Sequence, residues 1–122
     1  MGEADMKTIL IVEDTELNID LLTQLLEDDY RLLVARDGAE SLLVIENYTP
    51  DLILMDISLP VMDGYEAARQ IRKRYKTLPI IGLSSNAMKS DSEKAIEAGC
   101  NDYLTKPIDE DILMKKLQEY LG

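Results

Sequence analysis

The side chains of this sequence that could do chemistry follow short apolar runs, each at the point where the run ends. The runs KTILIV, DLILM, PIIGL and DYLT are followed by Glu13 and Asp14, by Asp56, by Ser84 and by Lys106, respectively. If the runs are parallel strands, their carboxyl ends meet along one edge of a sheet. Three carboxylates, a hydroxyl and a lysine at one edge would form a site for a divalent metal ion and a phosphoryl group.

The three acids are the candidate metal ligands. Free Asp and Glu side chains have pKa values of about 4, so Glu13, Asp14 and Asp56 are expected to be ionised near neutral pH. Crowded carboxylates favour a bound cation, and hard oxygen ligands suit Mg²⁺, with Mn²⁺ as the alternative ion. Each acid also has a simpler interpretation. Glu13 and Asp14 could mark a helix N-terminus, where acids are stabilising, and Asp56 could be a turn residue.

Asp56, Ser84 and Lys106 together indicate phosphoryl chemistry. A carboxylate beside a metal ion can attack phosphorus and form an acyl phosphate. Lys106 would supply a fixed positive charge and Ser84 a hydrogen bond to a phosphoryl oxygen, which are the two things that phosphoryl transfer chiefly needs. Taken singly, Lys106 could be a solvated lysine before a turn, and Ser84 an ordinary strand-end hydroxyl with Ser85 as a rival. Only the combination favours a phosphoryl site.

The elements that must position these residues alternate along the chain. Short apolar runs rich in Ile, Leu and Val predict strands at 7–12, 31–35, 51–55, 79–83 and 102–105. Helical patterns lie at about 15–28, 38–47, 65–75, 87–98 and 109–121. Alternating strands and helices predict an α/β fold, doubly wound, with a five-stranded parallel sheet covered by helices on both faces. The strands are almost wholly apolar, as expected when both faces of a sheet are buried.

The helical patterns also predict which side chains are buried and where two helices begin and end. Asp109 is expected to cap the last helix and Gly99 to end the fourth. The apolar positions expected to face the core are Leu21, Leu22, Leu25 and Leu26 in the first helix, Ala39, Leu42, Leu43 and Ile45 in the second, Ala67, Ala68 and Ile71 in the third, and Ile112, Leu113, Leu117 and Leu121 in the fifth.

Length and composition place the chain among compact globular domains. Its 122 residues suit one domain over 7–122, preceded by an acidic tail at 1–6. No apolar run is long enough to cross a membrane, and the N-terminus lacks the apolar segment of a signal peptide. These features predict a cytoplasmic protein without a membrane partner.

Residue counts exclude several kinds of chemistry. The chain has no histidine and a single cysteine, Cys100, so it can form neither an internal disulfide nor a histidine-based hydrolytic site. A phosphohistidine could only be carried by a partner. The net charge of −11 makes binding to nucleic acid improbable, because such a surface repels phosphates.

The order Glu13-Asp14, Asp56, Ser84, Lys106-Pro107 resembles the receiver domain of two-component response regulators. The resemblance extends to ILIVED at 9–14, DLILMD at 51–56, LPVMDGYE at 59–66 and AGCNDYLTKP at 98–107. It covers essentially residues 7–121, and the combined motifs are highly specific. The chain is most similar to single-domain regulators and to receivers of hybrid histidine kinases, and the sequence favours a stand-alone regulator only slightly over a receiver taken from a larger protein.

The resemblance implies a flavodoxin-like strand order, 2-1-3-4-5, and a role for each site residue. Asp56 would accept a phosphoryl group from a sensor histidine kinase or a histidine phosphotransfer protein, and Lys106 would contact that group. Asp14 and Asp56 would bind Mg²⁺ directly, Glu13 through water, and Ser58 through its backbone carbonyl. Ser84 and Tyr103 would be the switch residues, and the Lys106–Pro107 peptide bond would be cis.

The resemblance further implies a signalling output rather than an enzyme acting on other substrates. Phosphorylation would shift a two-state equilibrium and change binding of a downstream protein effector through the face formed by 87–98, 102–105 and 109–121. We expect a monomer that can dimerise when phosphorylated.

Three rival interpretations compete with this one. A phosphatase of the haloacid dehalogenase type would need a second acid where Ser58 stands. A flavodoxin-like carrier would need a Gly-rich phosphate loop in place of EDTELN at 13–18. A phosphorylation-independent interaction module stays as the alternative function.

Overall fold

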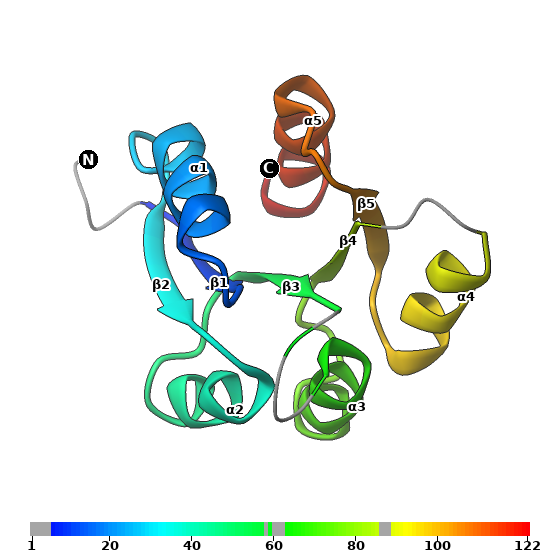
Figure 1. Ribbon diagram of the computed structural model, residues 1–122. Helices are drawn as coiled ribbons and strands as arrows, with labels where there is room; N and C mark the ends of the chain where they lie inside the picture. Colours follow the sequence, from blue (N-terminus) through cyan, green and yellow to red (C-terminus); the bar gives the residue numbers. More distant parts are fainter. Residues whose placement is uncertain (1–5, 58, 60–62, 86–88) are drawn as a thin grey trace.

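The computed structural model describes residues 6–57, 59, 63–85 and 89–122, with the side chains of 89–91 excepted (Figure 1). The described residues form five strands and five helices that alternate along the chain. Their bounds are β1 Thr8–Val12, α1 Glu16–Leu26, β2 Arg31–Ala35, α2 Gly38–Asn47, β3 Leu52–Asp56, α3 Gly64–Arg74, β4 Ile80–Ser84, α4 Lys89–Ala98, β5 Asp102–Thr105 and α5 Glu110–Leu121. Each element lies within a few residues of its predicted position. The first two residues of the helix predicted over 87–98 lie outside the described residues.

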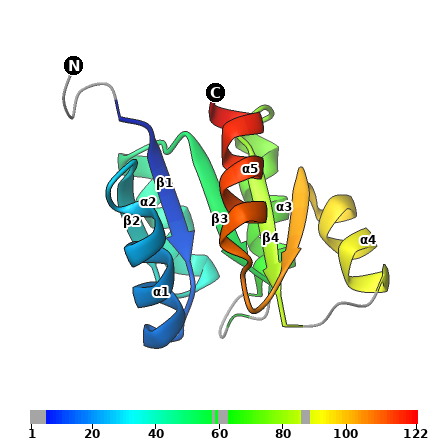
Figure 2. The ribbon, with the colours of Figure 1, turned by 90° about the horizontal axis from the view of Figure 1, so that it is seen from above.

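The five strands are all parallel and lie in the order β2-β1-β3-β4-β5, which confirms the predicted fold. Helices α1 and α5 cover one face of the sheet, and α2, α3 and α4 lie on the other (Figures 1 and 2). From β1 the chain moves to one side to form β2, and it then passes back across β1 to form β3 on the other side. The switch point of the topology therefore lies between the carboxyl ends of β1 and β3, where ligands bind in open α/β sheets.

The sheet is buried on both faces, and its alternating side chains contribute to two hydrophobic clusters in the described residues. Ile9 and Ile11 of β1 pack with α1 and α5, whereas Leu10 and Val12 pack on the other face. This alternation follows from the two-residue period of a strand. All five residues of β3 are buried, which explains why its sequence is apolar up to the final aspartate.

Local signals fix several helix ends. Asp37, Asp63 and Asp109 each accept a hydrogen bond from the backbone N–H three residues later, at 2.7, 2.9 and 3.1 Å. The predicted cap at Asp109 is therefore confirmed. Gly99 follows α4 with φ of 115°, and the N–H of Cys100 donates to the Ala95 carbonyl at 3.0 Å. This left-handed residue confirms Gly99 as the end of the helix.

The prediction of buried helix faces was partly wrong. Leu21, Leu43 and Ile112 were expected to face the core but are 50, 62 and 49% exposed. Each lies one position along its helix from a residue that is turned toward the protein, namely Leu22, Leu42 and Leu113. One position rotates a helix by about 100°, so a side chain next to the contacting stripe points sideways and stays in solvent.

Gly64 begins α3 directly against the end of β3. A Cβ atom at this position would lie 2.3 Å from the Asp56 carbonyl oxygen and 2.5 Å from the Ile57 Cα. Both are backbone atoms of the loop that leaves the strand, so they cannot turn aside as a side chain can. The Gly64 N–H donates to the Ile57 carbonyl at 3.3 Å. The absence of a side chain thus allows the helix to pack on the strand end that carries Asp56.

We predict that Gly64→Ala lowers the free energy of unfolding by about 1–3 kcal/mol, because the added methyl group forces the two backbones apart. Gly82→Ala in β4 is the matched control. Its Cβ would be no closer than 3.4 Å to another side chain, an ordinary contact. Urea denaturation followed by circular dichroism measures both. Equal losses of stability in the two variants would contradict the role assigned to Gly64.

Candidate functional site

The predicted site residues gather along the carboxyl edge of the sheet, each placed by a different strand. Glu13 and Asp14 follow β1, Asp56 is the last residue of β3, Ser84 is the last residue of β4, and Lys106 follows β5. The register aligns these ends, because Val12 lies opposite Met55 and Asp56 opposite Leu83. Residues far apart in the sequence therefore meet because the strands that carry them are parallel and in register.

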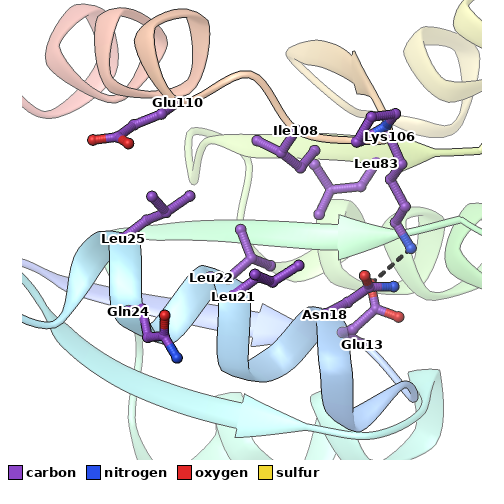
Figure 3. A pocket seen from close by; sticks show the side chains of 11 residues that line it. Glu13, Asn18, Leu21, Leu22, Gln24, Leu25, Leu83, Lys106, Ile108 and Glu110 are labelled. Atoms are coloured by element: carbon purple, nitrogen blue, oxygen red, sulfur yellow. Dashed lines mark hydrogen bonds and ion pairs between the residues drawn. The ribbon is translucent and has the colours of Figure 1, made fainter.

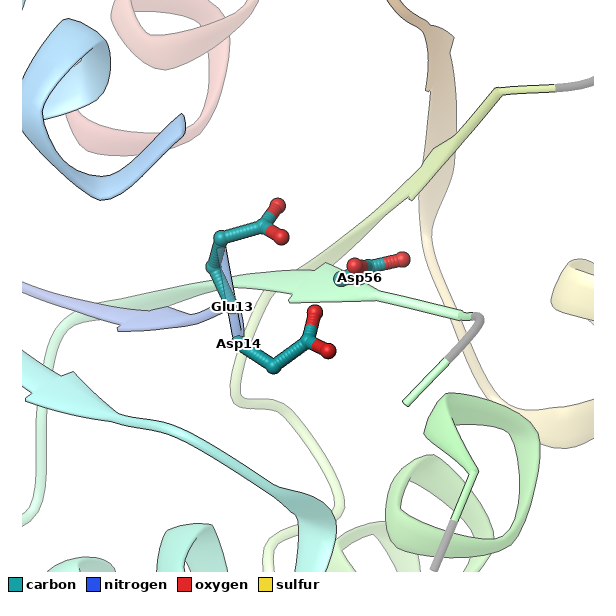
Figure 4. Close-up of side chains that lie close together, drawn as sticks. All are labelled: Glu13, Asp14 and Asp56. Atoms are coloured by element: carbon teal, nitrogen blue, oxygen red, sulfur yellow. The ribbon is translucent and has the colours of Figure 1, made fainter. Parts of the chain in front are cut away.

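The three carboxylates form one cluster (Figure 4). One oxygen of each of Glu13, Asp14 and Asp56 lies within 4.8 Å of those of the others. Glu13 is fully buried and Asp56 is 4% exposed, whereas Asp14 is exposed to solvent. Hard carboxylate oxygens suit Mg²⁺, which usually binds one or two of them and keeps water in its remaining positions. The donor set fits this ion, and exposed Asp14 leaves the cluster open to solvent.

Lys106 bridges the two buried acids of the cluster. Its Nζ donates to Glu13 Oε2 at 2.8 Å and to Asp56 Oδ2 at 3.2 Å. The lysine side chain is only 15% exposed, so both ion pairs are largely shielded from water. The Lys106 N–H also donates to the Ser84 carbonyl at 2.6 Å, which ties the end of β5 to the end of β4. The Lys106–Pro107 peptide bond is cis.

The pKa values of Glu13 and Lys106 reflect this burial. Burial raises the pKa of Glu13, the Lys106 hydrogen bond partly lowers it again, and the nearby Asp56 carboxylate raises it further, so that the net shift is upward. For Lys106, burial lowers the pKa, but the hydrogen bond to Glu13 and the charges of Asp56 and Glu13 outweigh it, and the pKa is raised. Lys106 therefore keeps its positive charge, which is what a phosphoryl group would need.

The predicted switch residues lie on neighbouring strands, Ser84 on β4 and Tyr103 on β5, two positions apart in the register. Ser84 is buried and lies opposite Thr105, one residue beyond the level of Asp56. Tyr103 lies opposite Gly82 and packs, half-buried, against the hydrophobic cluster on the α2, α3 and α4 side of the sheet. The hydroxyl thus lies at the candidate site and the aromatic ring closer to α4. Ser58, the predicted source of a backbone metal ligand, lies outside the described residues.

A groove between α1 and α5 opens beside the site, and sequence reasoning did not predict it (Figure 3). It encloses about 300 Å³ and is lined mainly by apolar side chains, among them Leu21, Leu25 and Ile108, with Glu13 and Lys106 at one end. The unusually broad apolar stripe of α1 was the available signal. The apolar residues of this stripe were expected to pack in the core, whereas Leu21, Leu22 and Leu25 line this groove.

A parallel sheet in this order, with acids at the switch point and a lysine from the fifth strand, defines the receiver class of α/β domain. The family model described as the response regulator receiver domain matches residues 9–118. The chain therefore belongs to the response regulator receiver family.

Individual relatives agree with this membership. The polar-differentiation response regulator DivK of Brucella ovis is 37% identical over 119 residues, which cover 95% of this chain and 97% of that protein. The receiver domain of the sensor histidine kinase PA1611 from Pseudomonas aeruginosa has a TM-score of 0.89 at 39% identity, over 96% of this chain and 98% of that one. That structure holds a magnesium ion in its active site cleft.

The fold is also shared with a putative response regulator from Chloroflexus aurantiacus, with a TM-score of 0.92 at 33% identity, over 96% of this chain and 98% of that chain. In the part of the chain that the structure describes, no helix has the length and apolar character needed to cross a membrane.

We predict that Asp14→Asn has opposite effects on stability and on metal binding. The substitution removes one of three crowded negative charges, and Asp14 does not share Lys106 with the other two acids. Without metal the variant should unfold at a higher urea concentration, while its affinity for Mg²⁺, measured by calorimetry, should fall. An unchanged affinity for Mg²⁺ would show that Asp14 is not a metal ligand, and a loss of stability would show that its charge does not destabilise the metal-free protein.

We predict that Lys106→Met lowers the free energy of unfolding by about 3 kcal/mol in EDTA, because it leaves two buried carboxylates without their cation. Addition of Mg²⁺ should restore more stability to this variant than to the wild type, since the ion replaces the missing charge. Lys115→Met, which changes an exposed lysine of α5, is the control and should change little. Equal responses of Lys106→Met and the wild type to Mg²⁺ would contradict the proposed charge balance.

Proposed function

We propose that Asp56 accepts a phosphoryl group from a phosphohistidine on a partner protein and that the modification switches the binding of an effector. The arrangement of Asp56 beside Asp14, Glu13 and the Lys106 ammonium group carries this proposal. These 122 residues contain no histidine, so the phosphohistidine lies outside them, on a sensor histidine kinase or a histidine phosphotransfer protein. The proposed receiver domain is 7–122, after a tail at 1–6.

In the transfer step, an Asp56 carboxylate oxygen forms a bond to phosphorus as the phosphorus–nitrogen bond to the donor histidine breaks. The electron pair of that bond returns to the imidazole. Asp14, Asp56 and the Ser58 carbonyl would hold Mg²⁺ directly and Glu13 would hold it through water, and the ion would supply positive charge for the phosphoryl oxygens; Mn²⁺ suits the same oxygen ligands. Lys106 exchanges its contact with Asp56 for a phosphoryl oxygen, while Glu13 holds the ammonium group in place.

The reverse chemistry is hydrolysis of the acyl phosphate. A water oxygen attacks phosphorus, the bond to the Asp56 oxygen breaks and its electron pair returns to the carboxylate, and inorganic phosphate leaves with both protons of the water, one of which it can release to solvent. We propose that the chain promotes only its own phosphorylation and dephosphorylation, and is not an enzyme on other substrates. Both steps need little beyond positioning and charge neutralisation, which the acid cluster and Lys106 can provide.

The switch is proposed to act through β4 and β5. A phosphoryl group adds nearly two negative charges and several acceptor oxygens. The Ser84 hydroxyl and the Lys106 ammonium group can pair with those oxygens, and the hydrogen bond between the Lys106 N–H and the Ser84 carbonyl links their movements. Tyr103 would follow, changing the face formed by α4, β5 and α5 that a protein effector contacts. The unmodified chain is proposed to be a monomer that dimerises when phosphorylated.

The groove between α1 and α5 is the surface that we propose the phosphoryl donor covers. It begins beside Glu13 and Lys106, so a partner that fills it would place its own residues next to Asp56. Leu21 and Leu25 of α1, and Ile108 just before α5, form the apolar surface of the groove. A helix of the donor protein with an apolar stripe would fit between them.

The proposed function is tested by intact mass after incubation with acetyl phosphate, with and without Mg²⁺. We expect a Mg²⁺-dependent gain of one phosphoryl group by the wild type, no gain by Asp56→Asn, and an unchanged gain by Asp28→Asn, which alters an exposed aspartate after α1. Circular dichroism establishes that each variant is folded.

Incorporation into Asp56→Asn at the wild-type rate would show that another residue is the acceptor. If a folded wild type gained nothing from acetyl phosphate and nothing from a phosphorylated histidine phosphotransfer protein, the chain would be a phosphorylation-independent interaction module.

A further inference from the structure

Helix α3 ends in a strongly basic segment on an otherwise acidic chain. Residues 69–76, which we call the α3 basic segment, hold five of the 13 basic residues, and no acidic residue occurs between Glu66 and Asp91. Because Gly64 packs on the end of β3 and α3 then runs to Arg74, the cations at the end of this segment lie about 15 Å along the helix from the strand end that carries Asp56. They are therefore separate from the phosphoryl site.

Two of the five basic residues take part in the fold. The Arg72 guanidinium donates to the Gly99 carbonyl, to Asn101 Oδ1 and to the Tyr75 carbonyl, each at about 2.8 Å, and so joins α3 to the end of α4. Arg69 pairs with Glu66 one turn earlier at 3.0 Å. These contacts within the chain account for Arg69 and Arg72, so neither residue requires a binding partner to explain its presence.

Lys73 and Lys76 have no such contacts, and those of Arg74 are weaker. Arg74 is 67% exposed, forms a long ion pair with Glu46 of α2 at 3.8 Å, and lies over the Tyr75 ring, 5.8 Å from its centroid. Lys73 and Lys76 are exposed, and no described carboxylate comes within the 4.0 Å of an ion pair. A helix C-terminus does favour cations. That effect does not explain Lys76, which follows the helix, nor why the last turns of the other four described helices lack basic residues.

An apolar groove lies beside these cations, between α2 and α3. It encloses about 200 Å³ over Leu42, Ile45 and Ile71, and it is also lined by Arg74, Tyr75, Gln70 and one acid, Glu46. The two helices lie side by side on the face of the sheet opposite α1 and α5 (Figure 1). Its volume is smaller than that of a typical small-molecule pocket and suits one large apolar side chain.

We propose that the surface formed by this groove and by Lys73, Arg74 and Lys76 binds an acidic protein segment that presents a large apolar side chain. The apolar side chain would occupy the groove, and acidic residues on either side of it would pair with the three cations. The small volume favours a short segment over a second copy of this chain, and the net charge of −11 opposes an extended contact with nucleic acid. This binding requires no phosphorylation and is independent of the function proposed above.

The test is a titration of the ¹⁵N-labelled full chain, without Mg²⁺ or phosphoryl donor, followed by amide chemical shifts. The probe is a synthetic peptide with one leucine flanked on both sides by glutamate and aspartate. We expect saturable shifts confined to α2, α3 and residues 75–76. Added NaCl should weaken the binding, because exposed charge pairs are screened. The same peptide with serine in place of the leucine should bind about tenfold more weakly, since the groove stays empty.

A pair of double variants separates the local cations from net charge. Lys73→Glu with Lys76→Glu should weaken binding of the leucine peptide about tenfold or more. The control, Lys7→Glu with Lys115→Glu, changes the net charge by the same amount. Its two exposed positions lie just before β1 and on α5, and it should weaken binding of the leucine peptide much less. All four lysines are exposed, so both variants should keep the wild-type urea midpoint.

Three outcomes would overturn the proposal. Equal weakening in the two double variants would mean that only the overall charge is sensed. Equal binding of the leucine and serine peptides would remove the groove from the interaction. Tighter binding of single-stranded poly(U), with the same shifted amides, would make the partner a nucleic acid instead of an acidic protein segment.

Discussion

The ion pairs of Lys106 with Glu13 and Asp56 are the interaction on which the rest of the structure depends. Burying two carboxylates is strongly unfavourable unless a cation accompanies them. The lysine that does so follows β5, two strands away from β3 and 93 residues from Glu13 in sequence. The charge balance therefore holds only if β1, β3, β4 and β5 keep their register. It also leaves Asp14 without a lysine, so the cluster keeps a net negative charge that a divalent ion can neutralise.

Burial on both faces of the sheet explains why β3 is apolar up to its last residue. Helices cover both faces, so a polar side chain within β3 would have no access to solvent, and chemistry is possible only where the strand ends. Gly64 completes this arrangement, because it lets α3 start against the Asp56 carbonyl. Asp56 is thus held by its strand, by Lys106 and by the helix that follows it. A carboxylate fixed in this way needs little reorganisation when it reacts.

Much of this was predictable from the sequence, and the exceptions have physical reasons. The elements followed from apolar periodicity, and the meeting of Glu13, Asp56, Ser84 and Lys106 followed from the parallel sheet that the alternating pattern implied. The strand order did not follow from periodicity and needed the family resemblance. Exposure of Leu43 and Ile112 was missed, because the rotation of a helix about its axis is set by tertiary packing and not by its own pattern. The groove between α1 and α5 was missed for the same reason.

The two grooves differ in a way that bears on what each binds. The groove between α1 and α5 ends at Lys106 and is otherwise bordered by polar and acidic side chains such as Glu110. The groove between α2 and α3 lies on the other face of the sheet, and it is lined by both Arg74 and Glu46, with exposed Lys73 and Lys76 in the same basic segment as Arg74. The excess of cations there favours an acidic partner for the second groove. Since the sheet separates the two grooves, a phosphoryl donor on one face and an acidic segment on the other would not compete for space.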